Sequence, residues 1–140
     1  MEETKNIINK IKIILVDDSE AFRICMKRFL EAEFNAEIIG EAANGIEFLK
    51  LKNIFYVDVV LMDLMMPEKG GYETTFEATS KYQNVKIIAV TNQYEIAYLN
   101  EILEAGFKAC VFKNNFFNEI IPTINKVMNG EYYVPDTIKI

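Results

Sequence analysis

Short apolar runs recur along the chain, and each one ends at a polar or charged residue. Five runs, rich in Val, Ile and Ala, cover residues 12–16, 36–42, 58–63, 86–90 and 109–112. Continuous apolar runs of this length are typical of strands that are buried on both faces of a parallel sheet. The pattern therefore predicts five strands, the third of which ends at Asp63.

The stretches between these runs have the apolar spacing of amphipathic helices. Ser19 is expected to cap the first helix, and Asn44-Gly45 turns the chain into the second. The third helix follows Gly70-Gly71 and ends at Lys81. Five strands that alternate with five helices are typical of a doubly wound α/β sheet with helices on both faces.

The last two helices have recognisable end signals. One covers residues 94–105 and ends before Gly106, where a C′ glycine is expected. The other is predicted to be capped by Asn118 and to run to Asn129. Pro122 then falls in its first turn or so, where the missing N–H costs little.

The length of 140 residues suits about one domain with its own core. Apolar residues make up 51% of the chain and charged residues 26%, which is ordinary for a globular protein. We expect an N-terminal arm at residues 1–10 and a single domain at 11–130. Residues 131–140 then form a tail or the start of a linker.

The net charge of −6 and the pI near 4.8 disfavour direct binding to nucleic acid, because no basic cluster is available to displace phosphate counterions. No apolar run is long enough to cross a membrane, and the N-terminus lacks the apolar segment of a secretory signal. We therefore expect a cytoplasmic protein without a membrane partner.

The sequence contains no histidine and two cysteines, Cys25 and Cys110. The lack of histidine excludes His-based acid–base catalysis and a Ser-His-Asp triad, and there is no CxxC pair for a zinc finger. Both cysteines lie in apolar segments and are predicted to be buried free thiols. Chemistry in this chain must therefore use carboxylates, hydroxyls, lysines or a hard metal ion.

Polar residues of interest lie at the ends of four predicted strands. Asp17 and Asp18 follow the first, Asp63 ends the third, Thr91 follows the fourth and Lys113 the fifth. The C-terminal ends of parallel strands meet at one edge, so we expect these side chains to form one site. Singly, each has an ordinary explanation, such as a helix cap or a surface lysine. Together they fit Mg²⁺ binding and phosphoryl transfer to an aspartate nucleophile.

These residues, in this order and spacing, resemble the receiver domain of two-component response regulators. The block MDLMMPEKGGYE around Asp63 carries the resemblance, together with Asp17-Asp18, Thr91 and Lys113, and the match covers residues 11–130. The resemblance implies a flavodoxin-like fold with strand order 2-1-3-4-5. It also implies a phosphorylation-activated signalling switch whose phosphoryl transfer is directed to itself, and not an enzyme that turns over a free substrate.

The same resemblance assigns roles to residues at the acidic end of the site. Asp63 accepts the phosphoryl group from a phosphohistidine of a sensor histidine kinase. Asp18, Asp63 and the backbone carbonyl of Met65 bind Mg²⁺ directly, and Asp17 binds it through water.

The resemblance further implies that Thr91 hydrogen-bonds the phosphoryl group and that Lys113 pairs with it. Movement of Thr91 then reshapes the surface of the fourth helix, the fifth strand and the fifth helix. The stretches GEAANG (40–45) and NKVMNGEYYVP (125–135) resemble receivers of the NarL/LuxR-type subfamily, which precede a LuxR-type DNA-binding domain. The chain is then either a receiver from a longer transcription regulator or a stand-alone receiver. Phosphorylation-dependent homodimers are common in the family, although the sequence assigns no dimer residue.

Three positions depart from the commonest family pattern. Cys110 replaces an aromatic residue, Asn114 replaces the proline after Lys113, and Asn92 replaces a small residue after Thr91. The Asn92 side chain is predicted to alter the phosphoryl lifetime, because it would hinder water or a partner beside the phosphoacceptor.

Other functions compete with this interpretation. An aspartate-nucleophile phosphatase would use a second acid two residues after Asp63, where Met65 stands. A nucleotide-binding Rossmann domain would carry GxGxxG after its first strand, and that motif is absent from the sequence. A receiver fold that binds partners without phosphorylation stays open as the alternative, and failure to bind Mg²⁺ would favour it.

Overall fold

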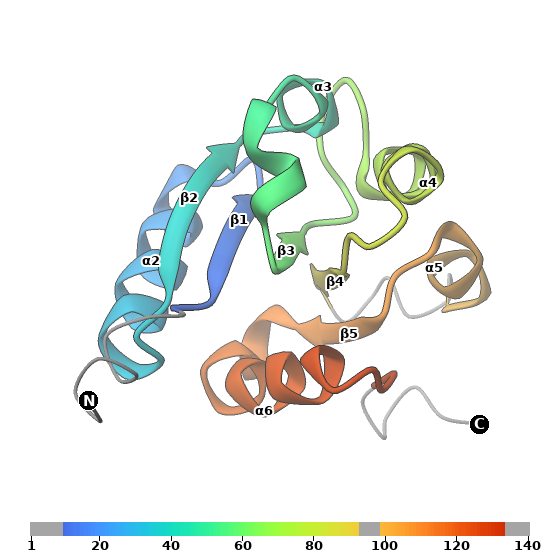
Figure 1. The fold of residues 1–140 in the computed structure, drawn as a ribbon. Helices are drawn as coiled ribbons and strands as arrows, with labels where there is room; N and C mark the ends of the chain where they lie inside the picture. Colours follow the sequence, from blue (N-terminus) through green and yellow to red (C-terminus); the bar gives the residue numbers. More distant parts are fainter. Residues whose placement is uncertain (1–9, 93–98, 134–140) are drawn as a thin grey trace.

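Five parallel strands form the central sheet of this computed structural model, which describes residues 10–92 and 99–133. The strands lie in the order β2-β1-β3-β4-β5 (Figure 1). Their bounds are β1 Lys12–Val16, β2 Glu37–Ala42, β3 Val59–Met62, β4 Ile87–Thr91 and β5 Ala109–Phe112. The predicted flavodoxin-like, doubly wound α/β fold with strand order 2-1-3-4-5 is confirmed.

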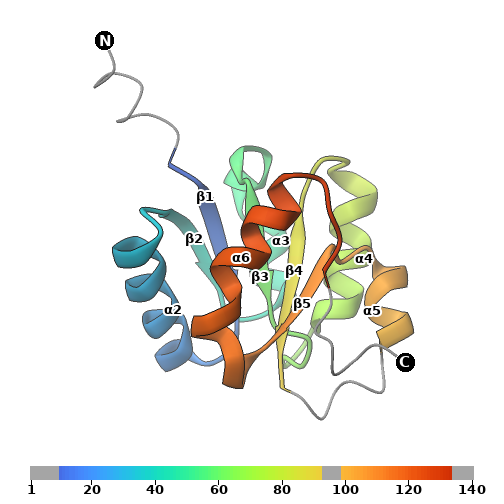
Figure 2. The ribbon, with the colours of Figure 1, turned by 90° about the horizontal axis from the view of Figure 1, so that it is seen from below.

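Helices cover both faces of this sheet. The described helices are α2 Glu20–Glu33, α3 Gly45–Leu49, α4 Gly71–Lys81, α5 Leu99–Ala105 and α6 Phe116–Met128, with the 3₁₀ helices η1 Lys52–Tyr56 and η3 Lys113–Asn115. One face carries α2 and α6, and the other carries α3, α4 and α5 (Figures 1 and 2). Within the described ranges, no helix is both long enough and apolar enough to cross a membrane.

Each strand sends alternate side chains into two separate cores. In β1, Ile13 and Leu15 pack on the side of α2 and α6, whereas Ile14 and Val16 pack on the side of α3, α4 and α5. All four side chains are fully buried. Burial on both faces explains why β1, β3, β4 and β5 are continuous apolar runs in the sequence and not alternating ones, whereas the edge strand β2 exposes Glu37 and Glu41.

The strand ends that carry the polar residues differ from prediction by one position. Asp63 does not end β3, because the strand stops at Met62. Asp63 still bonds to the sheet, since its N–H donates to the Val16 carbonyl at 2.9 Å. Thr91 is the last residue of β4 and not the first residue after it. Both side chains therefore lie at the C-terminal edge of the sheet, where the site was expected.

The predicted start of the last helix is wrong. α6 begins at Phe116, Asn115 occupies its N-cap position, and Asn118 lies inside the first turn. Phe116 is fully buried and directly follows η3, so packing of this ring into the core sets the start of the helix. Pro122 consequently lies in the second turn, where its missing N–H removes one intrahelical hydrogen bond.

Other predicted helix ends are confirmed. The Ser19 hydroxyl accepts a hydrogen bond from the Phe22 N–H at 3.2 Å, and the Asn44 side chain accepts one from the Glu47 N–H at 2.9 Å. Gly106 follows α5 with a φ of +108°, as a C′ glycine should. Residues 94–98 of the predicted fourth helix lie outside the described residues.

The prediction for the two cysteines is half right. Cys110 is buried in β5, as expected, but Cys25 is exposed on α2. The buried side of α2 is formed by Met26 and Leu30, so the neighbouring Cys25 points away from the core.

Candidate functional site

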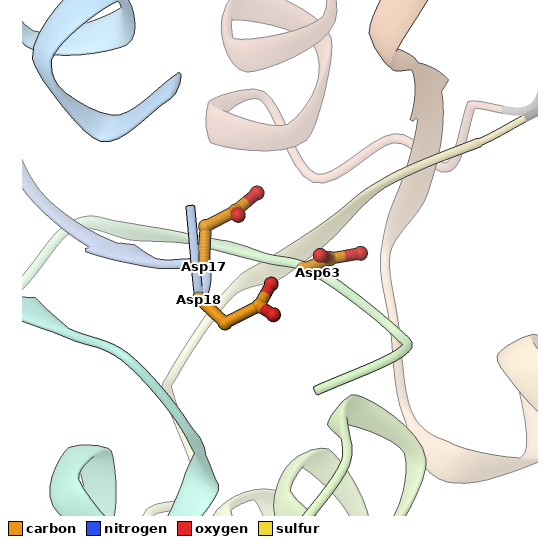
Figure 3. A group of neighbouring side chains, drawn as sticks. All are labelled: Asp17, Asp18 and Asp63. Atoms are coloured by element: carbon orange, nitrogen blue, oxygen red, sulfur yellow. The ribbon is translucent and has the colours of Figure 1, made fainter. Parts of the chain in front are cut away.

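Three aspartates meet at the C-terminal edge of the sheet. Asp17 and Asp18 directly follow β1, and Asp63 directly follows β3, which pairs with β1. One carboxylate oxygen from each residue lies within 4.8 Å of the other two (Figure 3). Asp17 and Asp63 are buried whereas Asp18 is exposed, so solvent reaches the cluster from the Asp18 side.

Lys113 reaches this cluster from the first position after β5. Its Nζ lies 2.9 Å from Oδ2 of Asp17 and 3.2 Å from Oδ2 of Asp63. The structure thus brings together the adjacent pair Asp17-Asp18 with Asp63 and Lys113, which are remote from it in sequence, as predicted. Because one ammonium faces three carboxyl groups, the cluster keeps an excess of negative charge.

Burial raises the pKa of Asp63 from its ordinary value of 3.8 to about 6, and the negative charge of Asp17 adds to this rise. Lys113 and the backbone N–H of Met65 act in the opposite direction. The pKa of Lys113 is also raised: burial opposes the rise, but the hydrogen bond to Asp17 and the charges of both aspartates outweigh it. A cation bound by the carboxylates would relieve their repulsion.

Thr91 supplies a hydroxyl at the same edge, at the end of the strand between β3 and β5. The residue is buried, and its Oγ1 has no hydrogen-bond partner in the described part of the chain. A buried hydroxyl without a partner is unfavourable. This one is therefore available to a ligand with acceptor oxygens.

The loop after Asp63 is packed closely against the start of α4. The Met65 N–H donates to the Asp63 carboxylate, and the Gly71 N–H donates to the Leu64 carbonyl at 2.9 Å. A Cβ at position 71 would lie 2.2 Å from the carbonyl oxygen of Asp63, so this approach requires glycine. The Met65 side chain is exposed, and the role of its carbonyl as a metal ligand stays a prediction.

Two side chains that sequence analysis does not identify support the site. Arg23 donates to the backbone carbonyl of Asp17 and forms an ion pair with Glu41 at 3.0 Å. The Nζ of Lys113 lies 4.9 Å from the centroid of the Phe22 ring. Both residues belong to the first turns of the helix that follows the acidic pair, and this position is the only signal in the sequence.

The three departures from the family pattern have definite positions. Cys110 is fully buried in β5, and Asn92 is exposed directly after Thr91. The Lys113–Asn114 peptide is trans, like every peptide in the described residues. An effect of Asn92 on the phosphoryl lifetime stays a prediction.

Comparison with known proteins gives consistent matches. A family model described as the response regulator receiver domain matches residues 13–125. The response regulator UvrY of Escherichia coli strain K12 is 34% identical over 91% of this chain, and the transcriptional regulatory protein LiaR of Bacillus subtilis is 34% identical over 86%. This chain covers 59% of the first relative and 57% of the second, so it spans little more than half of their length.

Solved structures agree with these matches. A two-component response regulator of the LuxR family from Aurantimonas has a TM-score of 0.85 and 27% identity, with 93% of each chain covered. The isolated receiver domain of RcsB from Salmonella enterica, solved with a phosphomimetic beryllium fluoride, has a TM-score of 0.81 over 93% of this chain and 96% of that one. Its identity of 18% supports the fold alone.

Proposed function

Because this chain belongs to the response regulator receiver domain family, we propose that it is a phosphorylation-activated switch in which Asp63 accepts a phosphoryl group from a sensor histidine kinase. One observation carries the proposal: three carboxyl groups lie within 4.8 Å of one another, and one ammonium pairs with two of them. An ordinary helix cap or surface lysine would not need this convergence.

The residues present fit Mg²⁺. Asp18 and Asp63 would hold the ion directly, the Met65 carbonyl would complete the protein ligands, and Asp17 would act through water. The support is the oxygen-only donor set, its excess negative charge and its open side at Asp18. When bound, the ion would neutralise charge on the phosphoryl oxygens.

Asp63, Lys113 and Thr91 have different roles in the phosphoryl transfer. A carboxylate oxygen of Asp63 attacks phosphorus, the bond from phosphorus to the histidine nitrogen of the kinase breaks, and that nitrogen keeps the electron pair. The Lys113 ammonium pairs with the phosphoryl oxygens, and the Thr91 hydroxyl donates a hydrogen bond to one of them. Asp63 must be ionised to attack, and a pKa of about 6 leaves it mostly ionised at neutral pH.

The structural change expected on phosphorylation follows from the position of Thr91 on β4. Engagement of its hydroxyl by the phosphoryl group would shift the surface of α5, β5 and α6, which correspond to the fourth helix, fifth strand and fifth helix of the sequence prediction. On this proposal the chain is a cytoplasmic switch and not an enzyme with a free substrate.

The process that this switch controls is also part of the proposal. The relatives are named as response or transcriptional regulators, and this chain covers little more than half of their length. We propose that residues 11–130 are the receiver, that 1–10 are an arm, and that 131–140 lead toward a LuxR-type DNA-binding domain. A phosphorylation-dependent homodimer is a further expectation; a solved structure of RcsB contains two dimers bound to two parallel DNAs.

Intact mass spectrometry after incubation with acetyl phosphate and Mg²⁺ tests the proposal. We expect one added phosphoryl group on the wild type and none on Asp63→Asn, or on the wild type with EDTA. Asp58→Asn is the matched control, because Asp58 lies at the opposite end of the same strand and bonds the Lys12 N–H at 2.8 Å. This variant should label like the wild type.

The competing function is a receiver fold that binds partners without phosphorylation. It predicts no adduct on a folded protein while a control receiver is labelled in parallel. Labelling of Asp63→Asn to the wild-type level would also contradict the proposal, because the acceptor would then be another residue.

A further inference from the structure

A groove of about 670 Å³ lies between α4 and α5, away from the aspartate cluster. Its apolar lining comes from Tyr72 and Phe76 of α4 and Ala105 of α5. Tyr72 and Ala105 belong to the core beneath, whereas Phe76 is 63% exposed on a helix whose other apolar residues are packed. An exposed aromatic ring beside an apolar groove is a common anchor point for a partner.

The groove is lined on both sides by carboxylates. Glu73 and Glu77 lie four residues apart on α4, and Glu101 and Glu104 lie three residues apart on α5, so each pair shares one helix face. Among the lining residues that the structure describes, Lys69 is the cation, and it is paired with Glu77 at 2.7 Å. The groove therefore combines an apolar base with an excess of negative charge, from Glu73 on α4 and from Glu101 and Glu104 on α5.

We propose that this groove binds a cationic amphipathic helix of a partner protein. The 11 residues of α4 extend over about 16 Å, which matches about three turns of a helix laid along it. An apolar strip at positions i, i+4 and i+7 would cover Phe76 and Tyr72, and flanking lysines or arginines would meet the glutamates of both walls.

The negative charge of the groove favours a cationic helix over nucleic acid or a second copy of this chain. Nucleic acid is excluded because its phosphates would meet the four glutamates, which lie on both sides of the groove. A second copy of this chain is disfavoured in this groove, because the sequence offers no basic cluster to meet the glutamates. This does not bear on a homodimer formed through another surface. A cationic helix gains from both the apolar base and the charged walls.

The groove shares α5 with the surface invoked for phosphorylation, but its other wall is α4, and neither β5 nor α6 lines it. Within the described residues, its two walls belong to helices that come after Asp63 and Thr91 in the chain: α4 begins at Gly71, after β3, and α5 begins at Leu99, after β4. A partner held between these helices would therefore contact the two elements next to the phosphoryl site. Docking itself needs no phosphoryl group, so its test does not depend on the proposed function.

Fluorescence anisotropy on the full chain tests the proposal with a labelled synthetic peptide. The probe is a helix-forming peptide of four turns with leucines at i, i+4 and i+7 and lysines on the remaining faces. Two control peptides have the same composition in scrambled order, or glutamate in place of lysine. We expect the probe to bind at least about tenfold more tightly than either control.

Variants of the groove locate the binding. Phe76→Ser and Glu101→Gln should each weaken the probe at least about fivefold. The matched controls Tyr56→Ser, with a side chain that is similarly exposed at another site, and Glu31→Gln, on α2, should change its affinity less than about twofold. All four positions are exposed, so circular dichroism should show unchanged folds.

Three results would overturn the proposal. The first is no binding of the probe, and the second is equal binding of the scrambled peptide. The third is an equal loss of affinity in the groove and control variants, which would mean general attraction to an acidic protein. Sedimentation in which Phe76→Ser alone abolishes self-association would assign the groove to a second copy instead.

Discussion

Opposing interactions act on the charge of Asp63. Burial and the neighbouring Asp17 disfavour its charge, while Lys113 and the Met65 N–H favour it, and burial outweighs them. The ionised carboxylate is thus unfavourable in the folded protein, and a bound cation would reduce this cost. This single residue combines reactivity with a cost to stability.

The substitution Asp63→Asn is expected to stabilise the protein at neutral pH without Mg²⁺. The folded pKa of about 6 is above the ordinary 3.8, so the folded state binds the proton more tightly. The ionised carboxylate therefore destabilises the fold above pH 6, and this effect fades as the pH falls from about 6 to about 4. Urea unfolding with EDTA should give a gain of about 1–3 kcal/mol at pH 7.5 and little change at pH 4.

A neutral or negative effect of Asp63→Asn at pH 7.5 would contradict this account, because the pairing with Lys113 would then outweigh burial. Asp58→Asn serves as the control, since the carboxylate of Asp58 lies outside the acidic cluster and bonds a backbone N–H. Its loss should reduce stability at neutral pH and not increase it.

At the scale of elements, the start of α4 is fixed by contact with the phosphoacceptor loop. The substitution Gly71→Ala would place a Cβ 2.2 Å from the Asp63 carbonyl oxygen and 2.9 Å from the Leu64 Cα. Both atoms belong to the backbone, so the helix or the loop must move. We expect a loss of about 1–3 kcal/mol in the free energy of unfolding and slower labelling by acetyl phosphate.

Gly40→Ala is the matched control for this substitution, because its Cβ would meet no atom closer than 3.5 Å. This variant should stay within about 0.5 kcal/mol of the wild type and label at the normal rate. Equal stability of both variants would show that the contact between α4 and the loop relaxes without cost.

Element types followed from the sequence more reliably than element ends. The strands were evident because burial on both faces makes their apolar runs continuous, and Ser19 and Asn44 carried the side chains that cap helices. The start of α6 was not evident, because Asn115 occupies the N-cap position without a side-chain cap hydrogen bond, and packing of Phe116 sets the start of the helix instead. Local sequence signals do not predict the end of a helix where tertiary packing determines it.

At the scale of the whole molecule, the parallel topology of the sheet places residues that are remote in sequence at one site. Asp17, Asp63 and Lys113 could be predicted as neighbours because parallel strands end at one edge. The support from Arg23 and the groove around Phe76 could not, because they depend on which helix faces come together. Residues at strand ends are thus predictable from order alone, and residues on helix faces are not.

On the proposal that the acidic cluster binds Mg²⁺, the stability of the whole molecule should depend on this ion. An ion that binds only the folded chain stabilises it by about 1.4 kcal/mol at ten times its dissociation constant. For a chain of this size, the melting temperature should rise by roughly 3–6 °C. The rise should shrink as the pH falls through 6, because protons compete with the ion at Asp63.

Asp18→Asn should abolish most of this thermal shift, because it removes a carboxylate on the open side of the cluster. Glu20→Gln is the control, since Glu20 is an exposed acid two residues away and lies outside the cluster. Differential scanning calorimetry at constant ionic strength measures both variants with Mg²⁺ and with K⁺ alone. Equal shifts in the two variants would mean that Mg²⁺ acts on the general negative charge of the chain and not on the three aspartates.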